Sequence, residues 1–246
     1  MRLRDWLAAE PFELAMTSGF FGFYAHAGML DALLAEGLVP SGACGSSAGA
    51  LVAASWASGL ETGALIETLR TLRREDFWDP SLGLGLLRGG LFRARLEAMM
   101  PVVRFEECRA PLAISTFDVL LRATYVVTRG EIAPAVVASC AVPLLFHPVR
   151  HDGRWLLDGG IRDRPGIEGA RLPRQLVHHL SSKSPWRTSV PVPTGPSRVA
   201  LVLDGLPRSG PTKLEAGVEA MSLAREATRR ALDRPIDAGV VRLNAR

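Results

Sequence analysis

Lysine is almost missing from this chain of 246 residues. The chain has 29 lysine and arginine residues, and only two of them, Lys183 and Lys213, are lysines. Nearly all of the positive charge is therefore arginine. The formal net charge is +4, and the basic residues gather in no dense run. This pattern argues against a nucleic-acid-binding protein. A mildly basic surface suits anionic headgroups, although a GC-rich genome produces the same excess of arginine.

Cysteine is also scarce. Cys44, Cys108 and Cys140 are widely spaced and odd in number. They fit neither a disulfide framework nor the ligand spacing of a metal site. We therefore expect a reducing compartment, the cytoplasm, and a protein without a metal ion.

Long apolar runs are missing too, since no stretch reaches the roughly 20 residues that a membrane-spanning helix needs. At the N-terminus, Asp5, Glu10 and Glu13 interrupt any apolar core of a secretory signal. We expect neither a signal peptide nor a membrane-spanning helix, and at most a peripheral contact with a membrane. With 48% apolar and 22% charged residues, the chain can bury a sizeable core, and we expect one domain over residues 1–246.

Short apolar runs alternate with segments of helical spacing along most of the chain. Strands that alternate with helices are typical of an α/β sandwich with a mainly parallel sheet. The pattern predicts strands over residues 12–18, 38–43, 112–117, 123–128, 155–158, 172–180 and 199–203, and helices over residues 23–36, 50–58, 61–74, 91–100, 132–146 (as far as the proline at 143) and 212–232.

The strongest motif is Gly45-Ser46-Ser47-Ala48-Gly49, between a predicted strand and a predicted helix. A nucleophile elbow needs this sequence because its serine sits in a strained turn, and glycines two residues away on either side let the backbone pack closely. The turn presents the hydroxyl at a helix N-terminus, which favours developing negative charge. Only Ser47 has both glycines at the required spacing. The alternative is a turn of small residues that serves packing alone.

A second motif, Ser18-Gly19-Phe20-Phe21-Gly22, follows the first predicted strand. Acyl transfer needs amide donors aimed at the oxyanion, and glycines let backbone N–H groups point into a site. A dinucleotide-binding loop is excluded because the glycine spacing does not match G-x-G-x-x-G. A plain structural turn remains the alternative.

The third motif, Asp158-Gly159-Gly160, ends a short predicted strand. An acid at this place can be delivered to the carboxyl edge of a sheet, where it accepts the serine proton or positions a base. Asp-Gly alone is above all a turn signal. The nearby acids Asp152 and Asp163 are expected to be solvated loop charges.

In this order, the three motifs resemble the patatin-like phospholipase family. The resemblance extends from about Phe12 to Pro165, and it includes the segment from Ala138 to Pro143, which is similar to the family's Ala-Ser-x-Ala-x-Pro segment. The family implies a three-layer α/β/α sandwich with a mainly parallel central sheet. It also implies hydrolysis of acyl esters in phospholipids or other lipids by a Ser–Asp dyad, without an obligatory histidine and without a cofactor.

The resemblance implies roles for individual residues. Ser47 would be the nucleophile, Asp158 the dyad acid, and the backbone amides of residues 19–22 the oxyanion hole. This chain departs from the family in its first motif, because Thr17 and Ser18 stand where several consecutive glycines are usual. Phenylalanine also stands where the family often has arginine or lysine.

The stretch from Phe77 to Phe92 is apolar, rich in glycine and without a period. An apolar segment with glycine hinges suits a lid over an acyl-chain pocket, and such a lid could also touch a lipid surface. The alternative is an irregular segment packed on the core.

Two other functions stay open at the level of sequence. An α/β-hydrolase would add His178 or His179 to the same serine and aspartate, in the chain order Ser–Asp–His. A catalytically inactive family member would bind lipid or act as a scaffold. His26 and His147 are expected to be structural, with a general-base role open for His147.

Overall fold

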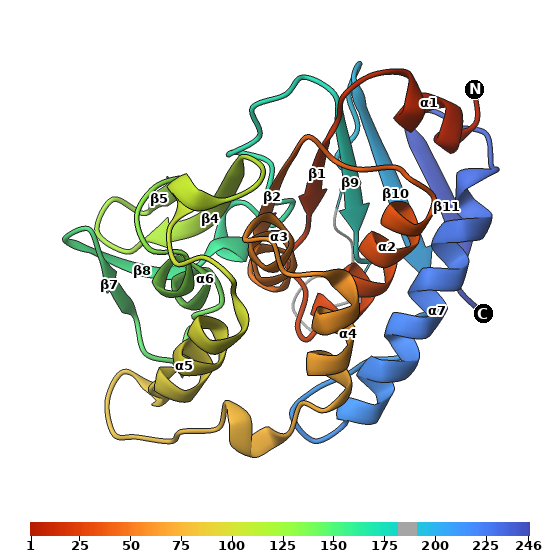
Figure 1. Cartoon of the computed structure of the whole chain (residues 1–246). Helices are drawn as coiled ribbons and strands as arrows, with labels where there is room; N and C mark the ends of the chain where they lie inside the picture. The colour runs from red at the N-terminus through yellow and green to blue at the C-terminus, as the bar shows by residue number, and fades with distance from the viewer. Residues whose placement is uncertain (182–190) are drawn as a thin grey trace.

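A computed structural model describes residues 1–181 and 191–246 of the chain (Figure 1). In these residues nine strands form one sheet, and a separate ribbon has two strands. The strands of the sheet are β1 (Glu13–Met16), β2 (Gly42–Ser46), β4 (Leu112–Asp118), β5 (Ala123–Val127), β7 (Val149–His151), β8 (Arg154–Asp158), β9 (Gln175–His179), β10 (Arg198–Asp204) and β11 (Val240–Asn244), and those of the ribbon are β3 (Gly85–Leu87) and β6 (Leu144–Phe146). The helices are α1 (Leu3–Ala9), α2 (Phe23–Ala35), α3 (Ala48–Ala57), α4 (Thr62–Arg70), α5 (Gly90–Met99), α6 (Ile132–Ser139) and α7 (Leu214–Leu232), with short 3-10 turns η1 (Arg74–Asp76), η2 (Phe105–Glu107) and η3 (Gly159–Ile161).

The central sheet is mainly parallel. Its strand order is β11-β10-β9-β1-β2-β4-β8-β7, and β5 pairs with β4. Neighbours from β11 to β4 pair in parallel, whereas β5, β7 and β8 form the antiparallel part. This arrangement confirms the predicted α/β class. It also brings the ends of β1, β2 and β9 to one edge, as expected for a site at the carboxyl ends of parallel strands.

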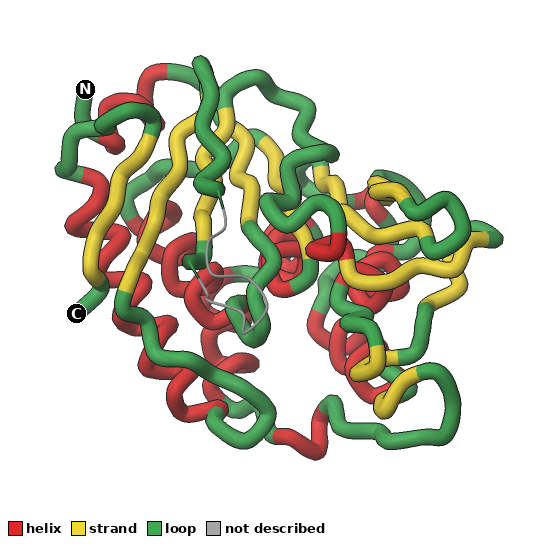
Figure 2. Tube along the Cα trace, turned by 180° about the vertical axis from the view of Figure 1, so that it is seen from behind, coloured by secondary structure: helices red, strands yellow, loops and turns green. Residues whose placement is uncertain are grey.

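The two faces of the sheet are covered differently. Helices α2, α3, α4 and α7 lie on one face, where α2 and α7 run side by side (Figure 1). On the other face, the small residues Ala15, Cys44 and Ala113 pack against Ile167 and Ala170 from the segment after β8. Figure 2 shows this face from behind, with loops crossing the strands.

The longest helix, α7, is amphipathic, as its sequence predicts. It buries Ala220, Met221 and Ala224 and turns arginines outward. A Cβ at Gly28 of α2 would lie 2.0 Å from the Met221 carbonyl oxygen, so only glycine permits this close helix contact. No helix among residues 1–181 and 191–246 combines the length and apolar character that crossing a membrane requires.

Most predicted elements are confirmed, although several bounds differ, as in α4, which ends at Arg70 where the prediction extends to residue 74. Two further differences have a clear cause. The strand predicted at 38–43 lies at 42–46 instead. Its Gly-Ala-Cys-Gly-Ser sequence has little intrinsic strand preference, and burial between β1 and β4 compensates for this. The helix predicted up to Pro143 ends at Ser139, because the chain turns there toward the short strand β6. The elements α1, β3, β6, β7 and β11 were not predicted.

Candidate active site

Ser47 occupies a strained turn between β2 and α3. Its backbone has φ +52° and ψ −117°, a region that a non-glycine residue rarely adopts. Both flanking glycines make close contacts. A Cβ at Gly45 would lie 2.5 Å from the Gly49 carbonyl carbon, and one at Gly49 would lie 2.0 Å from the Met16 oxygen. The motif therefore has the packing that a nucleophile elbow requires, and it leaves Ser47 only 8% exposed.

The elbow is tied to α6 by Ser139. The Ser47 N–H donates to Ser139 Oγ at 2.8 Å, and this hydroxyl donates to the Ser115 carbonyl at 2.7 Å. The N–H of Ser47 is thus already occupied and is no free oxyanion donor. Sequence reasoning noticed Ser139 only as part of the 138–143 segment, because a hydrogen bond between residues 92 positions apart leaves no local signal.

Asp158 ends β8 and faces this turn. It is 5% exposed, and its N–H donates to the Ala141 carbonyl at 2.9 Å. Its Oδ1 accepts the Gly160 N–H at 2.7 Å. Its Oδ2 is buried and has no hydrogen-bond partner within the described part of the chain. The structure therefore holds one carboxylate oxygen in place and leaves the other available.

The Ser47 hydroxyl lies against the Asp158 carboxylate. Burial raises the pKa of Asp158 from 3.8 to about 6, although the Ser47 hydroxyl and the Gly160 N–H favour the charged form. Asp158 is then ionised at neutral pH, but it holds a proton better than a solvated aspartate does. A base with its pKa close to the working pH is well suited to accept a serine proton.

The two glycines that follow Asp158 pack closely against neighbouring segments. A Cβ at Gly160 would lie 2.4 Å from Ser18 Oγ, and one at Gly159 would lie 2.1 Å from the Ser115 oxygen. The acid loop after β8 therefore packs directly against the first motif and β4. A Cβ at Gly159 would also lie 2.7 Å from Ser46 Oγ of the elbow, so the three motifs, far apart in the sequence, meet here.

The prediction that Asp163 is a solvated loop charge is wrong. Asp163 is 2% exposed and accepts the Ser115 hydroxyl at 2.6 Å. It also accepts the N–H groups of Gly166, Ile167 and Glu168. Four donors compensate for the burial of this carboxylate, which anchors the segment after η3.

The side chain of Asp152, in contrast, is 51% exposed, in accordance with its expected place in a solvated loop. Its nearest ionic partner is His151, at 3.8 Å between Oδ2 and Nε2. Asp152 therefore has none of the fixed donors that hold Asp158 and Asp163 in place.

The loop of the first motif has three amides without a backbone acceptor in the described residues. The Gly22 N–H donates to the Gly19 carbonyl at 2.8 Å, so this amide is used within the loop. The amides of Gly19, Phe20 and Phe21 donate to no backbone carbonyl in the described residues. Phe21 has φ +53°, a strained value that reorients the peptides around it. Three of the four predicted amides thus remain candidates for the oxyanion hole.

Two buried histidines hold the start of this loop. His26 Nε2 lies 2.8 Å from the Thr17 carbonyl, and His26 Nδ1 lies 2.8 Å from His178 Nδ1. A carbonyl only accepts, so His26 carries its proton on Nε2. Burial lowers the pKa of His26 to about 4, which keeps the ring neutral. His26 Nδ1 must then accept the N–H of His178 Nδ1. Both rings act as structural supports of the loop.

The histidines do not complete a triad. Successive side chains of a strand point to opposite faces, and β9 directs His178 to His26, whereas His179 lies near the charges of Asp204 and Arg242. His147 contacts Ser81 Oγ at 3.1 Å. Across residues 1–181 and 191–246, no histidine hydrogen-bonds to the elbow serine or to the acid. The geometry favours a dyad.

Cys140 was not predicted as a site residue, yet its sulfur lies against the Ser47 hydroxyl. Burial and the charge of Asp158 raise the pKa of this thiol well above its ordinary value. Cys140 therefore stays protonated and forms a wall of the site. Its place in the 138–143 segment was the one signal available in the sequence.

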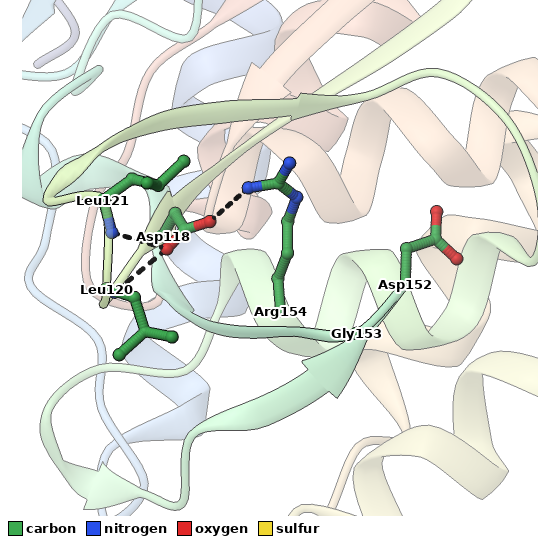
Figure 3. A pocket seen from close by; sticks show the side chains of 6 residues that line it. All are labelled: Asp118, Leu120, Leu121, Asp152, Gly153 and Arg154. Atoms are coloured by element: carbon green, nitrogen blue, oxygen red, sulfur yellow. Dashed lines mark hydrogen bonds and ion pairs between the residues drawn. The ribbon is translucent and has the colours of Figure 1, made fainter.

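A polar hollow elsewhere in the molecule has internally satisfied charges (Figure 3). Asp118 Oδ2 lies 2.6 Å from Arg154 Nη1, and Asp118 Oδ1 accepts the N–H groups of Leu120 and Leu121 at 2.9 Å. Arg154 and Asp158 stand at opposite ends of β8, so this hollow is not part of the site at Ser47. Nowhere in the described residues do three His, Cys, Asp or Glu side chains form a group that could hold a metal ion.

Comparisons with known proteins identify the family. The family model described as patatin-like phospholipase matches residues 14–171, more than half of the chain. An uncharacterized NTE family protein of Mycobacterium tuberculosis, Rv1063c, is 34% identical over 155 residues, which cover 61% of this chain and 42% of that protein. Another, Mb2594 of Mycobacterium bovis, is 26% identical over 158 residues, which cover 63% of this chain and 27% of that protein. The chain thus spans less than half the length of these curated relatives.

The fold is also shared with a solved structure. VipD from Legionella pneumophila superposes with a TM-score of 0.69 at 13% sequence identity, over 91% of this chain and 67% of that chain. This likeness concerns the fold alone. The family match, in contrast, includes the elbow, the loop of the first motif and the acid loop. The chain therefore belongs to the patatin-like phospholipase family.

Proposed function

We propose that this chain hydrolyses acyl esters of phospholipids or other lipids through an acyl-enzyme, with Ser47 as nucleophile and Asp158 as its partner. The observation that carries the proposal is the Ser47 hydroxyl lying against the buried Asp158 carboxylate, whose Oδ2 has no hydrogen-bond partner in the described residues. Membership of a phospholipase family supports a lipid as substrate.

The first half of the reaction acylates the serine. As Ser47 Oγ bonds to the acyl carbon, its proton passes to Asp158 Oδ2, and the carbonyl oxygen becomes an oxyanion. Amides of Gly19, Phe20 and Phe21 donate to that oxyanion, together with the field of the α3 N-terminus. When the tetrahedral intermediate collapses, the bond to the alcohol breaks, and the leaving oxygen takes the proton from Asp158.

The second half releases the acid. Water gives a proton to Asp158 as its oxygen attacks the acyl carbon of the ester on Ser47. Collapse of the second tetrahedral intermediate breaks the bond to Oγ, and the proton returns to the serine. The fatty acid leaves, and both side chains regain their initial state, so each turnover consumes one water molecule.

The apolar segment from Phe77 to Phe92 supports a lipid substrate. Its first ring, Phe77, packs on Phe21 of the first motif with centroids 5.8 Å apart. The segment therefore contacts the proposed oxyanion loop, where a lid over an acyl chain would lie. We expect shortening of this segment to lower activity on aggregated lipid more than on soluble esters.

A fluorophosphonate probe tests the nucleophile. It should label the wild type and Ser46→Ala, because Ser46 shares the turn but is fully buried, and it should not label Ser47→Ala. Labelling that persists in Ser47→Ala, or a wild type that is never labelled, would contradict the proposal. The second outcome points to a lipid-binding protein without hydrolase activity.

A panel of lipids identifies the substrate. Phospholipids, lysophospholipids and neutral acyl esters, each incubated with wild type and with Ser47→Ala, should yield free fatty acid only with wild type. Mass analysis of the products then shows the attacked position and the preferred chain length.

A further inference from the structure

A turn that bears two exposed leucines projects close to the site. The Ser81 N–H donates to the Leu86 carbonyl at 2.9 Å and closes a turn over the residues between them. Leu82 is fully exposed and Leu84 is 77% exposed. We call residues 81–86 the leucine turn. It belongs to the stretch between η1 and α5, which runs along the edge of the molecule (Figure 1). Large apolar side chains gathered at a projecting turn mark an interaction site.

The leucine turn is held in place by close backbone packing. A Cβ at Gly85 would lie 2.3 Å from the Phe146 carbonyl carbon, and one at Gly83 would lie 2.0 Å from the His147 ring. Ser81 Oγ also contacts His147 Nε2 at 3.1 Å, and β3 pairs with β6. Because the glycines seat the turn on β6, its leucines stay outward and do not fold back onto the core.

The same strand connects the leucine turn to the proposed dyad. Strand β6 begins at Leu144, which is 84% exposed and pairs with Gly85. Just before it, the Ala141 carbonyl accepts the N–H of Asp158, and the Cys140 sulfur lies against the Ser47 hydroxyl. Residues 140–144 thus run directly from the site to the exposed leucines.

The side chains around the leucine turn carry a net positive charge. Residues 80–96 contain three arginines and no acid, and residues 141–151 contain one arginine and no acid. Arg88 follows the turn directly and is exposed. Asp79, which accepts backbone N–H groups at the start of α5, offsets one of these charges, and Arg93 is paired with Glu97 and Glu131. Arg88 and Arg150 remain exposed. The surface therefore combines apolar side chains with positive charge.

We propose that the leucine turn, together with Leu144, docks the protein on a lipid surface that contains anionic headgroups. Leucines of a projecting turn enter the apolar layer, and arginines at its base meet the headgroups. A second copy of the chain fits less well, because a two-fold contact would bring like charges together. The inference deepens the proposed function and rests on it for the claim that the surface is also the source of substrate.

Co-sedimentation with vesicles tests the proposal. The full chain should bind vesicles of phosphatidylglycerol and phosphatidylcholine, and it should bind pure phosphatidylcholine more weakly. We expect Leu82→Gln/Leu84→Gln to lower the partition coefficient at least tenfold, with an unchanged melting temperature. Arg88→Gln should lower binding about threefold, and only to the anionic vesicles.

A second exposed pair is the matched control. Leu120 and Leu121 are 75% and 66% exposed, but they line the hollow that contains Asp118 and Asp152 (Figure 3). The variant Leu120→Gln/Leu121→Gln should bind vesicles like wild type, because the two carboxylates that line the hollow outnumber its one arginine, and the hollow offers no net positive charge to anionic headgroups.

Hydrolysis of a soluble short-chain ester separates the two proposals. In Leu82→Gln/Leu84→Gln this rate should fall less than about twofold below that of wild type, far less than vesicle binding does, because both side chains are exposed. Vesicle binding that is equal in these two proteins would overturn the docking surface, and so would a wild-type dimer in light scattering that the double variant loses. A wild type that binds vesicles but hydrolyses no ester would leave the docking surface standing and overturn the proposed function.

Discussion

The turn at Ser47 and the leucine turn are both seated by glycines, yet they expose opposite chemistry. Gly45 and Gly49 let the first turn sink against β1, where a hydroxyl is 8% exposed. Gly83 and Gly85 seat the second turn on β6, where Leu82 is fully exposed. The usual distribution of polar residues outside and apolar residues inside is reversed at both places.

This reversal has a physical consequence. A buried carboxylate lowers the stability of the fold and an outward leucine adds nothing to it, so neither is explained by folding alone. At the first turn, Asp158 gains proton affinity in exchange. At the second, the leucines become stabilising only when another apolar phase covers them. The turn at Ser47 thus holds the proposed catalytic groups, whereas the leucine turn offers the proposed surface on which the lipid substrate is met.

Removing the carboxylate should have the largest effect. We expect Asp158→Asn to lower kcat about 10⁴-fold, because an amide accepts no proton from Ser47, and the loss of a comparable acid has this scale. Hydrolysis of a soluble ester measures the change. Asp152→Asn is the control and should keep wild-type activity, since the side chain of Asp152 is 51% exposed. A similar loss in both variants would show that the effect is not specific to the buried acid.

A methyl group at the elbow should disturb the fold as well as the site. In Gly49→Ala, the added Cβ would lie 2.0 Å from the Met16 oxygen, and we expect the free energy of unfolding to fall by about 3 kcal/mol. Gly63→Ala in α4 is the control, because no atom lies within 4 Å of its added Cβ. It should be neutral or stabilising by at most about 1 kcal/mol. Equal denaturation midpoints for the two variants would refute the packing argument.

The pH dependence should report the buried carboxylate. Since the pKa of Asp158 is about 6, kcat/KM for a soluble ester should rise through pH 6 and be about a hundredfold lower at pH 4. A limb centred near the ordinary value of 3.8 would mean that burial does not control this group.

The same pKa predicts a stability effect of defined sign. The folded state binds the proton more tightly than the unfolded state does, so ionisation of Asp158 lowers stability as the pH rises from about 4 to about 6. Asp158→Asn should therefore stabilise the fold by roughly 3 kcal/mol at pH 8 and hardly at all at pH 3. Denaturant unfolding at the two pH values measures the difference.

The smallest effect concerns the loop that meets the oxyanion. In His26→Phe the Thr17 carbonyl loses its 2.8 Å contact, and we expect kcat to fall about tenfold with little change in KM. In His26→Gln the side-chain amide can still donate, so this variant should recover most of the rate. Equal rates in both variants would show that His26 does not position the loop.

Some features could be predicted because their cause is local. The elbow follows from two glycines around Ser47, and the amphipathic stripe of α7 follows from its period. Strand β2 was displaced from its predicted bounds because its small residues have no strand preference of their own. The position of a buried strand is decided by its neighbours in the sheet, and these come from elsewhere in the chain.

The sequence by itself determined the α/β class, the serine in its elbow and the aspartate that ends β8, because each depends on a short pattern of residue types. Only the tertiary structure decided that Ser139 occupies the Ser47 N–H, that Asp163 is buried and that Leu82 projects fully. These outcomes depend on which distant segments meet, and no period or spacing encodes such contacts.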